Sequence, residues 1–159
     1  MEPVPETREV LRRIDEWSEA DQLGGLQKQG DRVRGIVPSC VGLSVSYNES
    51  GLTFTLVASS AEIAALDGVQ YSVGGPCVDA VHEDSVICAG GEGGLLDEGR
   101  WADFARAAAA RGVASTLSLP VHHAGRVIGG VNVYASEPQA FDGKHERVAA
   151  VLGLSLIHI

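Results

Sequence analysis

The sequence predicts one α+β domain built around an antiparallel β-sheet. Residues 41–47 and 52–58 each alternate apolar and polar side chains with a period of two, which is typical of half-buried strands. Residues 113–121 and 126–135 are predicted as a second strand pair, joined by the tight connection His122-His123-Ala124-Gly125. Segments with apolar residues at helical spacing lie before, between and after these hairpins, which is the element order of an α+β domain.

Two helices are predicted ahead of the first hairpin. Between Glu6 and Ala20, the apolar residues Val10, Ile14 and Trp17 recur at helical spacing. Residues 21–37 repeat this pattern although they contain four glycines, each of which disfavours a helix by about 1 kcal/mol relative to alanine. A helix outside the main body often serves a dimer, so we assign residues 1–38 to packing or dimer contacts and predict a homodimer.

The middle of the chain is predicted to be irregular. Ser59 and Glu62 have the spacing of a capping box, which predicts a short helix over residues 60–66. The segment 67–100 is predicted to be loop-rich and to contain three small features. They are a brief helix near residues 78–81, a short strand over residues 85–88 and a mobile glycine loop over residues 89–94.

Two further helices are predicted in the second half. Trp101, Phe104, Ala105 and Ala108 mark one face of a helix that ends at Arg111-Gly112, where a cation in the last turn precedes a capping glycine. A last helix is predicted to start at Phe141-Asp142, with Val148, Val151 and Leu152 on its inner face.

Composition limits the class of protein. A chain of 159 residues is long enough for one domain with a substantial core. The formal charge of −9 repels phosphate backbones and anionic lipid surfaces, so we expect no direct binding of nucleic acid and no membrane association. The chain shows no signal-peptide pattern, which predicts a cytoplasmic protein. Its three cysteines form no CxxC pair, so neither a disulfide framework nor a zinc site is indicated.

The stretch from Gly74 to Ala80 joins a flexible loop to the start of a helix. Pro76 suits the first helical position, so Cys77 is predicted to lie in the first turn. The free backbone N–H groups there would favour a thiolate or a bound anion. The alternative, which the general burial of free cysteines favours, is a helix cap with a small buried thiol.

A set of motifs along the chain resembles one known family. The motifs are Tyr71 with Gly75-Pro76-Cys77 and Ala80, Arg100-Trp101 with Phe104-Ala105, Gly112-Val113-Ala114-Ser115 with Leu119-Pro120, and Gly129-Gly130-Val131-Asn132-Val133-Tyr134-Ala135 ahead of Phe141. They resemble a GAF domain, and most closely those of actinobacterial regulators in which an RNA-binding ANTAR domain often follows. We assign residues 39–152 to the GAF core and residues 153–159 to a tail that is truncated or non-native.

The resemblance implies a fold, a role and a set of candidate residues. GAF domains have an antiparallel sheet of five to six strands flanked by helices, with a pocket on one sheet face that the middle segment roofs. The implied role is non-catalytic sensing of a small molecule, dimerisation or both, with the output made by a domain outside this chain, such as an ANTAR domain. The candidate ligand-binding residues are Tyr71, Cys77, Trp101, Ser115 and Asn132.

The sequence does not name a ligand or a cofactor. No motif matches a cyclic-nucleotide site, and Cys77 is followed by valine instead of the histidine that accompanies a bilin-binding cysteine. His82 lies near the expected roof, but a histidine at a helix end is more often a surface residue than a haem ligand. A small, largely apolar metabolite held between Tyr71, Trp101 and the sheet is the remaining interpretation.

Two other functions stay open at this stage. One is a free methionine-R-sulfoxide reductase of the same fold, which would use Cys77 and Cys88, although that family carries a further downstream cysteine that this chain lacks. The other is an interaction module without a ligand, whose pocket its own side chains fill. Neither His122-His123 nor the carboxylates of the glycine-rich segment, Glu92, Asp97 and Glu98, have the arrangement of a metal or acid–base site.

Overall fold

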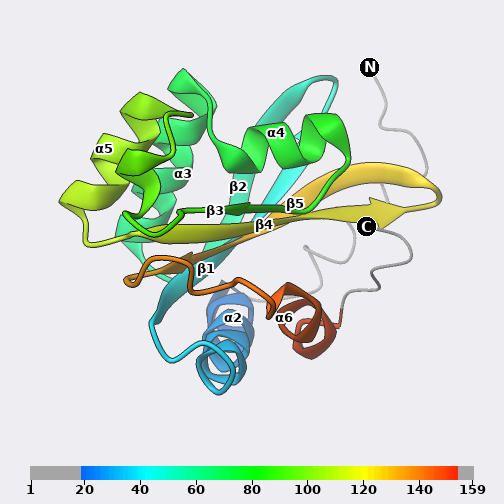
Figure 1. The fold of residues 1–159 in the computed structure, drawn as a ribbon. Coiled ribbons are helices and arrows are strands. Elements are labelled where there is room, and N and C mark those ends of the chain that lie inside the picture. The colour runs from blue at the N-terminus through cyan, green and yellow to red at the C-terminus, as the bar shows by residue number, and fades with distance from the viewer. Residues whose placement is uncertain (1–18, 154–159) are drawn as a thin grey trace.

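The computed structural model describes residues 19–153 (Figure 1). The predicted helix between Glu6 and Ala20 therefore lies outside the described residues, except for its last two positions, and so does most of the assigned tail. Helix α2 spans Glu19–Arg34, in place of the predicted helix over residues 21–37.

A five-stranded antiparallel sheet forms the centre of the domain, with the strand order β2-β1-β5-β4-β3. Both predicted hairpins are confirmed, and so is the α+β fold class. A turn at Ser50 and Gly51 closes the first hairpin, and one at Ala124 and Gly125 closes the second; all four residues have positive φ. The strands are β1 (Cys40–Glu49), β2 (Leu52–Ala58), β3 (Ile87–Ala89), β4 (Ser115–His123) and β5 (Arg126–Ala135).

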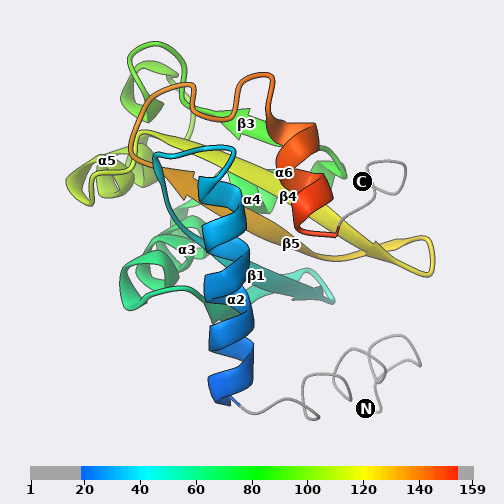
Figure 2. The same cartoon turned by 90° about the horizontal axis from the view of Figure 1, so that it is seen from below.

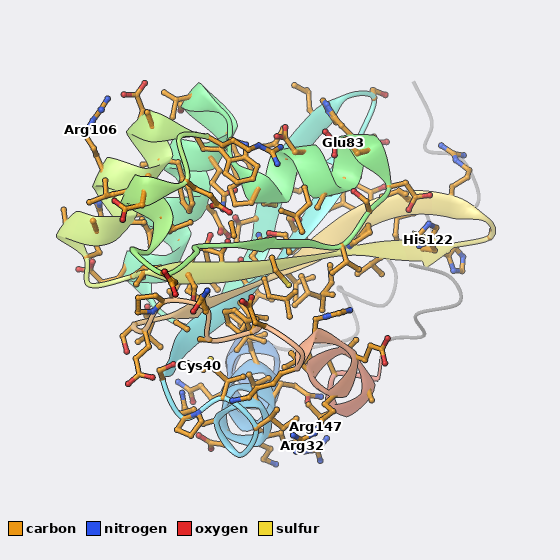
Figure 3. The ribbon with its side chains drawn as sticks, in the orientation of Figure 1. Arg32, Cys40, Glu83, Arg106, His122 and Arg147 are labelled. Atoms are coloured by element: carbon orange, nitrogen blue, oxygen red, sulfur yellow. The ribbon has the colours of Figure 1, made fainter. Side chains whose placement is uncertain are left out.

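Helices cover both faces of the sheet. The helices α3 (Ala61–Val73), α4 (Pro76–Glu83) and α5 (Ala102–Ala110) lie on the side that we call the upper face (Figure 1). Helix α2 and helix α6 (His145–Val151) lie across the opposite, lower face (Figure 2). Arg32 of α2 and Arg147 of α6 are on the outer surface of this lower helix layer (Figure 3).

The two faces of the sheet differ in chemistry because neighbouring residues of a strand point to opposite sides. The lower face carries the main apolar core, which combines Leu117 and Leu119 of β4 with Val131 and Val133 of β5. The helices α2 and α6 contribute Val33 and Val148 to it. A second apolar cluster, which includes Leu66, Phe104 and Ala108, joins α3 to α5 above the sheet.

Helix α3 departs from the prediction in its start and its length. Ser60, and not Ser59, is the capping residue, because its hydroxyl accepts the N–H of Ile63 at 3.3 Å. The Ser59 hydroxyl instead accepts the N–H of Leu43 at 3.0 Å. The helix continues through residues 67–73, which were predicted as loop, because its buried face extends from Ile63 to Gln70.

Two other segments also correct the prediction. The glycine segment at residues 89–94 is packed against the start of β4: a Cβ on Gly90 would lie 2.4 Å from the carbonyl oxygen of Ala114. The last helix starts at His145 instead of Phe141, after Gly143 with its positive φ of 69°. Helix α5 fits its prediction, and Gly112 follows it with a φ of 74°.

Candidate functional site

Buried polar side chains line the upper face of the sheet beneath α3 and α4. The three central strands each contribute two of them, and α3 adds Asp67 and Gln70. Each of these side chains is at most 4% exposed. We call this group the polar layer; it consists of Ser44, Ser46, Asp67, Gln70, Thr116, Ser118, Asn132 and Tyr134.

Asp67 lies at the centre of the polar layer, and neutral donors surround it. The hydroxyl of Thr55 donates to its Oδ2 at 2.7 Å, and the Nδ2 of Asn132 donates to its Oδ1 at 3.4 Å. The hydroxyl of Tyr134 also donates to Oδ1. Burial raises the pKa of the Asp67 carboxyl, and hydrogen bonds from Ser44, Tyr134 and the other donors oppose that shift only in part.

Gln70 links the polar layer to the first turn of α4. Its Nε2 donates to the Tyr134 hydroxyl at 2.9 Å, and its Oε1 accepts the backbone N–H of Cys77 at 2.8 Å. The side chain thereby satisfies one of the N–H groups that a helix leaves free at its N-terminus. A Cβ on Gly75 would lie 2.3 Å from this Oε1 atom, so the glycine makes room for the contact.

Cys77 is a buried thiol, 1% exposed, whose sulfur lies 3.9 Å from the Ser46 hydroxyl. Burial, together with the negative charge of Asp67, raises the pKa of this thiol to about 12. Of the two interpretations of this stretch, the buried thiol fits the structure and the thiolate does not, because desolvation outweighs the effect of the helix terminus.

Three oxygens of the polar layer have no hydrogen-bond partner among residues 19–153: Thr116 Oγ1, Ser118 Oγ and Asn132 Oδ1. Ser118 and Asn132 are directly paired across β4 and β5, so their side chains lie next to each other on the upper face. Buried polar atoms rarely remain unpaired, and a donor from a bound molecule could satisfy these.

Comparison with known proteins supplies the family. The model of the GAF domain family matches residues 26–155. The chain belongs to the GAF domain family. No curated protein matches the chain.

Several solved structures share this GAF fold at low sequence identity. A domain of a putative two-component sensor histidine kinase from Sinorhizobium meliloti is 16% identical, with a TM-score of 0.57 over 80% of this chain and 83% of that one. The type II free methionine-R-sulfoxide reductase from Thermoplasma acidophilum is 15% identical, with a TM-score of 0.56 over 84% and 95%. The cyanobacteriochrome TePixJ GAF domain is 17% identical, with a TM-score of 0.51 over 84% and 89%.

Three of the five predicted ligand-binding residues meet at the polar layer of this GAF domain. Asn132 belongs to the layer, and the sulfur of Cys77 lies against it. The hydroxyl of Tyr71 is 2.7 Å from that of Thr55, which in turn donates to Asp67.

The other two predicted residues lie elsewhere. The indole Nε1 of Trp101 donates to Asp79 of α4 at 2.8 Å, and the Arg100 guanidinium stacks on the ring at 4.0 Å from its centroid. Ser115 belongs to the lower face, since it alternates with Thr116, and its hydroxyl donates to the carbonyl oxygen of Glu137 at 2.7 Å. The structure therefore does not bring Trp101 and Ser115 to the other three.

Asp67 and Gln70 were missed by the sequence analysis, because residues 67–73 were predicted as loop. A signal was present: Ile63, Leu66, Asp67 and Gln70 have the spacing of one helix face. Because two of these residues are polar, the pattern did not read as an apolar stripe.

His82, His122 and Glu98, which the sequence analysis considered, each have a defined place in the fold. His82 is exposed in the last turn of α4. His122, labelled in Figure 3, places its Nε2 2.8 Å from an oxygen of Asp84, and Glu98 accepts the N–H of Gly90 at 2.9 Å. Within residues 19–153, no group of three potential metal ligands is found. Among the same residues, no helix is long and apolar enough to cross a membrane.

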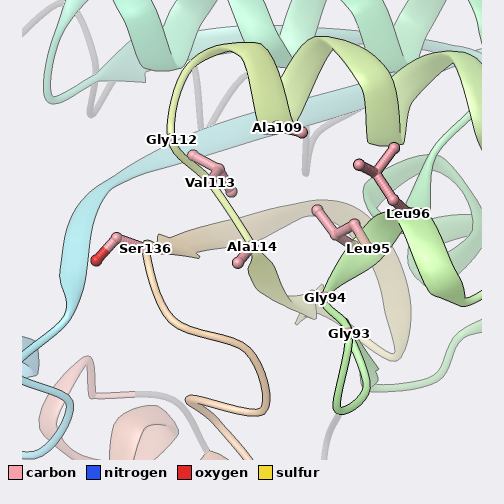
Figure 4. Close-up of a pocket in the computed structure, with 9 residues that line it drawn as sticks. All are labelled: Gly93, Gly94, Leu95, Leu96, Ala109, Gly112, Val113, Ala114 and Ser136. Carbon is pink, nitrogen blue, oxygen red and sulfur yellow. The ribbon is translucent and has the colours of Figure 1, made fainter.

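The hollow shown in Figure 4 is lined by few polar groups that could bind a ligand. It has a volume of about 210 Å³ and lies between the glycine segment and the end of α5. Aliphatic side chains and glycines line it, with Ser136 as its one hydroxyl. A larger hollow of about 370 Å³ lies between α2, β1 and the start of α3, where Arg34 is paired with Asp31.

Cys77 and Cys88 lie on opposite sides of the sheet. Cys77 contacts Ser46, which belongs to the upper face. Cys88 is paired with Leu117, a residue of the lower core, so its side chain points to the lower face. A disulfide between these two cysteines would require the sheet to rearrange.

Proposed function

We propose that this GAF domain is a non-catalytic sensory module that binds a small molecule at the polar layer. In this proposal the ligand favours one arrangement of the roof formed by residues 74–99, and this shift is passed to the terminal helices. The domain acts as a homodimer through residues 1–38. Its output domain lies outside residues 1–159, and the motif resemblance favours an RNA-binding ANTAR domain for that role.

The observation that carries the proposal is the set of unpartnered oxygens beneath α4. Asn132 Oδ1 can only accept a hydrogen bond, so a ligand that pairs with it must offer an N–H or O–H group. The layer contains a carboxyl group and no cationic side chain, and the Cys77 N–H is already capped by Gln70. These features favour a neutral or cationic ligand over a phosphate.

The second candidate is a ligand-free interaction module. It is favoured by Gln70 and Tyr134, whose large side chains are 1% and 0% exposed and fill space above the sheet. In that case the hydrogen bonds of the polar layer help to select one folded structure, and a partner protein would bind to an outer surface of the domain.

Native mass spectrometry of protein purified from its host, combined with its light-absorption spectrum, distinguishes these candidates. We expect a dimer that carries a small molecule without a chromophore. We expect Asn132→Leu to lose the molecule, because it removes the acceptor at similar volume, and Ser115→Ala to keep it, because that hydroxyl lies on the lower face.

Three results would contradict the sensory proposal in different ways. An absorption spectrum of haem or bilin would show that the ligand is a chromophore and not a small metabolite. A monomer at high protein concentration would exclude the dimer. Protein that carries no ligand and shows no thermal shift with a metabolite collection would favour the interaction module.

A further inference from the structure

Helix α4 is short; it packs its buried residues Pro76, Cys77, Ala80 and Val81 against the domain and makes a few polar contacts around that apolar face. It has eight residues and follows Gly74, which has a φ of 89°. Its C-cap Asp84 has a φ of 51° and is bonded to His122 of β4. On its outer side, Asp79 accepts from the indole of Trp101.

The N-terminal attachment depends on one side chain from another helix. The N-cap residue Gly75 provides no side-chain hydrogen bond, so the Oε1 of Gln70 serves as the cap for Cys77. The backbone carbonyl of the same Gln70 accepts the N–H of Gly74 at 2.8 Å. Gln70 therefore joins the end of α3 to the start of α4 through both its backbone and its side chain.

The side chain of Gln70 is also hydrogen-bonded to the polar layer. Its Nε2 donates to Tyr134, and Tyr134 donates to Asp67. A guest that engaged Tyr134 or Asp67 would compete with this chain of hydrogen bonds and so alter the capping of α4. The contact requires Gly75, since any Cβ there would collide with the Gln70 amide.

We propose that Gln70 is a latch that holds α4 closed over the polar layer, so that α4 opens as a unit without unfolding of the whole domain. Opening exposes Cys77, in the first turn of this helix, and the Ser46 hydroxyl that its sulfur contacts. The role of this latch in sensing rests on the proposed function. The opening of α4 itself does not require a ligand.

The three cysteines provide the assay. Cys77 is buried in α4 and reports its opening, whereas Cys40 is 4% exposed in the lower core and reports unfolding of the sheet. Cys88 is exposed and serves as a reference for reagent activity. Labelling with iodoacetamide under native conditions, read by peptide mass spectrometry, measures all three sites in one sample.

Two variants break the latch from opposite sides. Gln70→Met removes both side-chain hydrogen bonds at similar length, and Gly75→Ala places a methyl group where the Gln70 amide lies. Gly75 has a φ of −179°, so alanine is not strained there by its backbone. The control is Gly91→Ala, at a position outside the helices where an added Cβ meets nothing within 4 Å.

We expect wild-type Cys77 to label faster than Cys40. Both latch variants should raise the labelling rate of Cys77 relative to Cys40 by about five-fold or more, the factor that corresponds to loss of a typical helix cap. Gly91→Ala should leave this ratio within about two-fold of wild type.

The latch is overturned if Cys77 and Cys40 accelerate together, because the variants then act on global stability. It is also overturned if the ratio stays unchanged in both variants, or if Gly91→Ala changes it equally. No ligand is present in this assay, so its outcome is independent of the search for a bound metabolite.

Discussion

Asp67 is a buried carboxyl group whose hydrogen-bond donors among residues 19–153 are neutral. It is 0% exposed, and hydroxyl and amide groups donate to its oxygens. Burial raises its pKa above the ordinary value of 3.8. A raised pKa means that the folded state holds this proton more tightly than the unfolded chain, so deprotonation of Asp67 costs stability.

Replacing Asp67 by asparagine should therefore remove a pH-dependent loss of stability. The stabilising contribution of the Asp67 proton is complete below pH 3.8 and is lost as the pH rises through the raised folded-state pKa. We expect Asp67→Asn to gain stability relative to wild type between acid and neutral pH. Urea unfolding of both proteins from pH 4 to pH 8 measures this difference.

The geometry offers the new amide a partner. Asn132 Oδ1 is unpartnered and could accept from the added NH₂ group after rotation of its own amide. If the free energy of unfolding of the wild-type protein instead increases relative to that of Asp67→Asn as the pH rises, the fold stabilises the carboxylate. The direction assigned to the pKa of Asp67 is then wrong.

At the scale of the elements, close approach of backbones fixes the sheet. Gly129 on β5 faces Tyr47 on β1, and a Cβ on Gly129 would lie 2.0 Å from the carbonyl oxygen of Ser46. This contact is with backbone, so a larger residue at position 129 must displace one of the two strands.

Gly129→Ala should accordingly destabilise the domain by about 1–3 kcal/mol, the usual cost of overpacking. Gly91→Ala is the control, because a Cβ there meets nothing within 4 Å, and we expect it to change stability by less than about 0.5 kcal/mol. Urea unfolding at neutral pH compares the two. Equal stability of the two variants would show that the β1–β5 pairing adapts freely at this point.

Local patterns predicted some elements better than others. The hairpins followed from alternation and turn residues, which act between neighbours in the sequence, and both are present. The extension of α3 did not follow, because Asp67 and Gln70 are polar and become buried only through partners on β2, β5 and α4. The register of Gly129 against Ser46 likewise depends on the assembled sheet.

At the scale of the whole molecule, the sheet divides the cysteines between two environments. Cys77 lies with the polar layer above the sheet, and Cys88 points to the lower face, where partial burial of the sulfur and then the nearby Asp142 raise its pKa to about 11. The reductase alternative from the sequence analysis requires these two sulfurs to meet.

Oxidation of the folded protein with diamide should therefore form no disulfide between Cys77 and Cys88. Peptide mass spectrometry without reduction measures this bond, and the same oxidation in urea is the positive control, since the unfolded chain brings the two cysteines together. A Cys77–Cys88 peptide from the native protein would support the reductase and argue against a fixed separation by the sheet.

The sequence by itself determined the α+β class, the two hairpins, the helix start at Pro76 and the motifs that resemble a GAF domain. These features rest on periodicity, turn residues and caps, which involve residues close together in the chain. Only the tertiary structure decided which polar residues form the site, because its hydrogen bonds join positions far apart, such as Asp67 and Tyr134. It also decided that Ser115 and Cys88 lie on the other face, since the side of a sheet that a strand residue occupies depends on register.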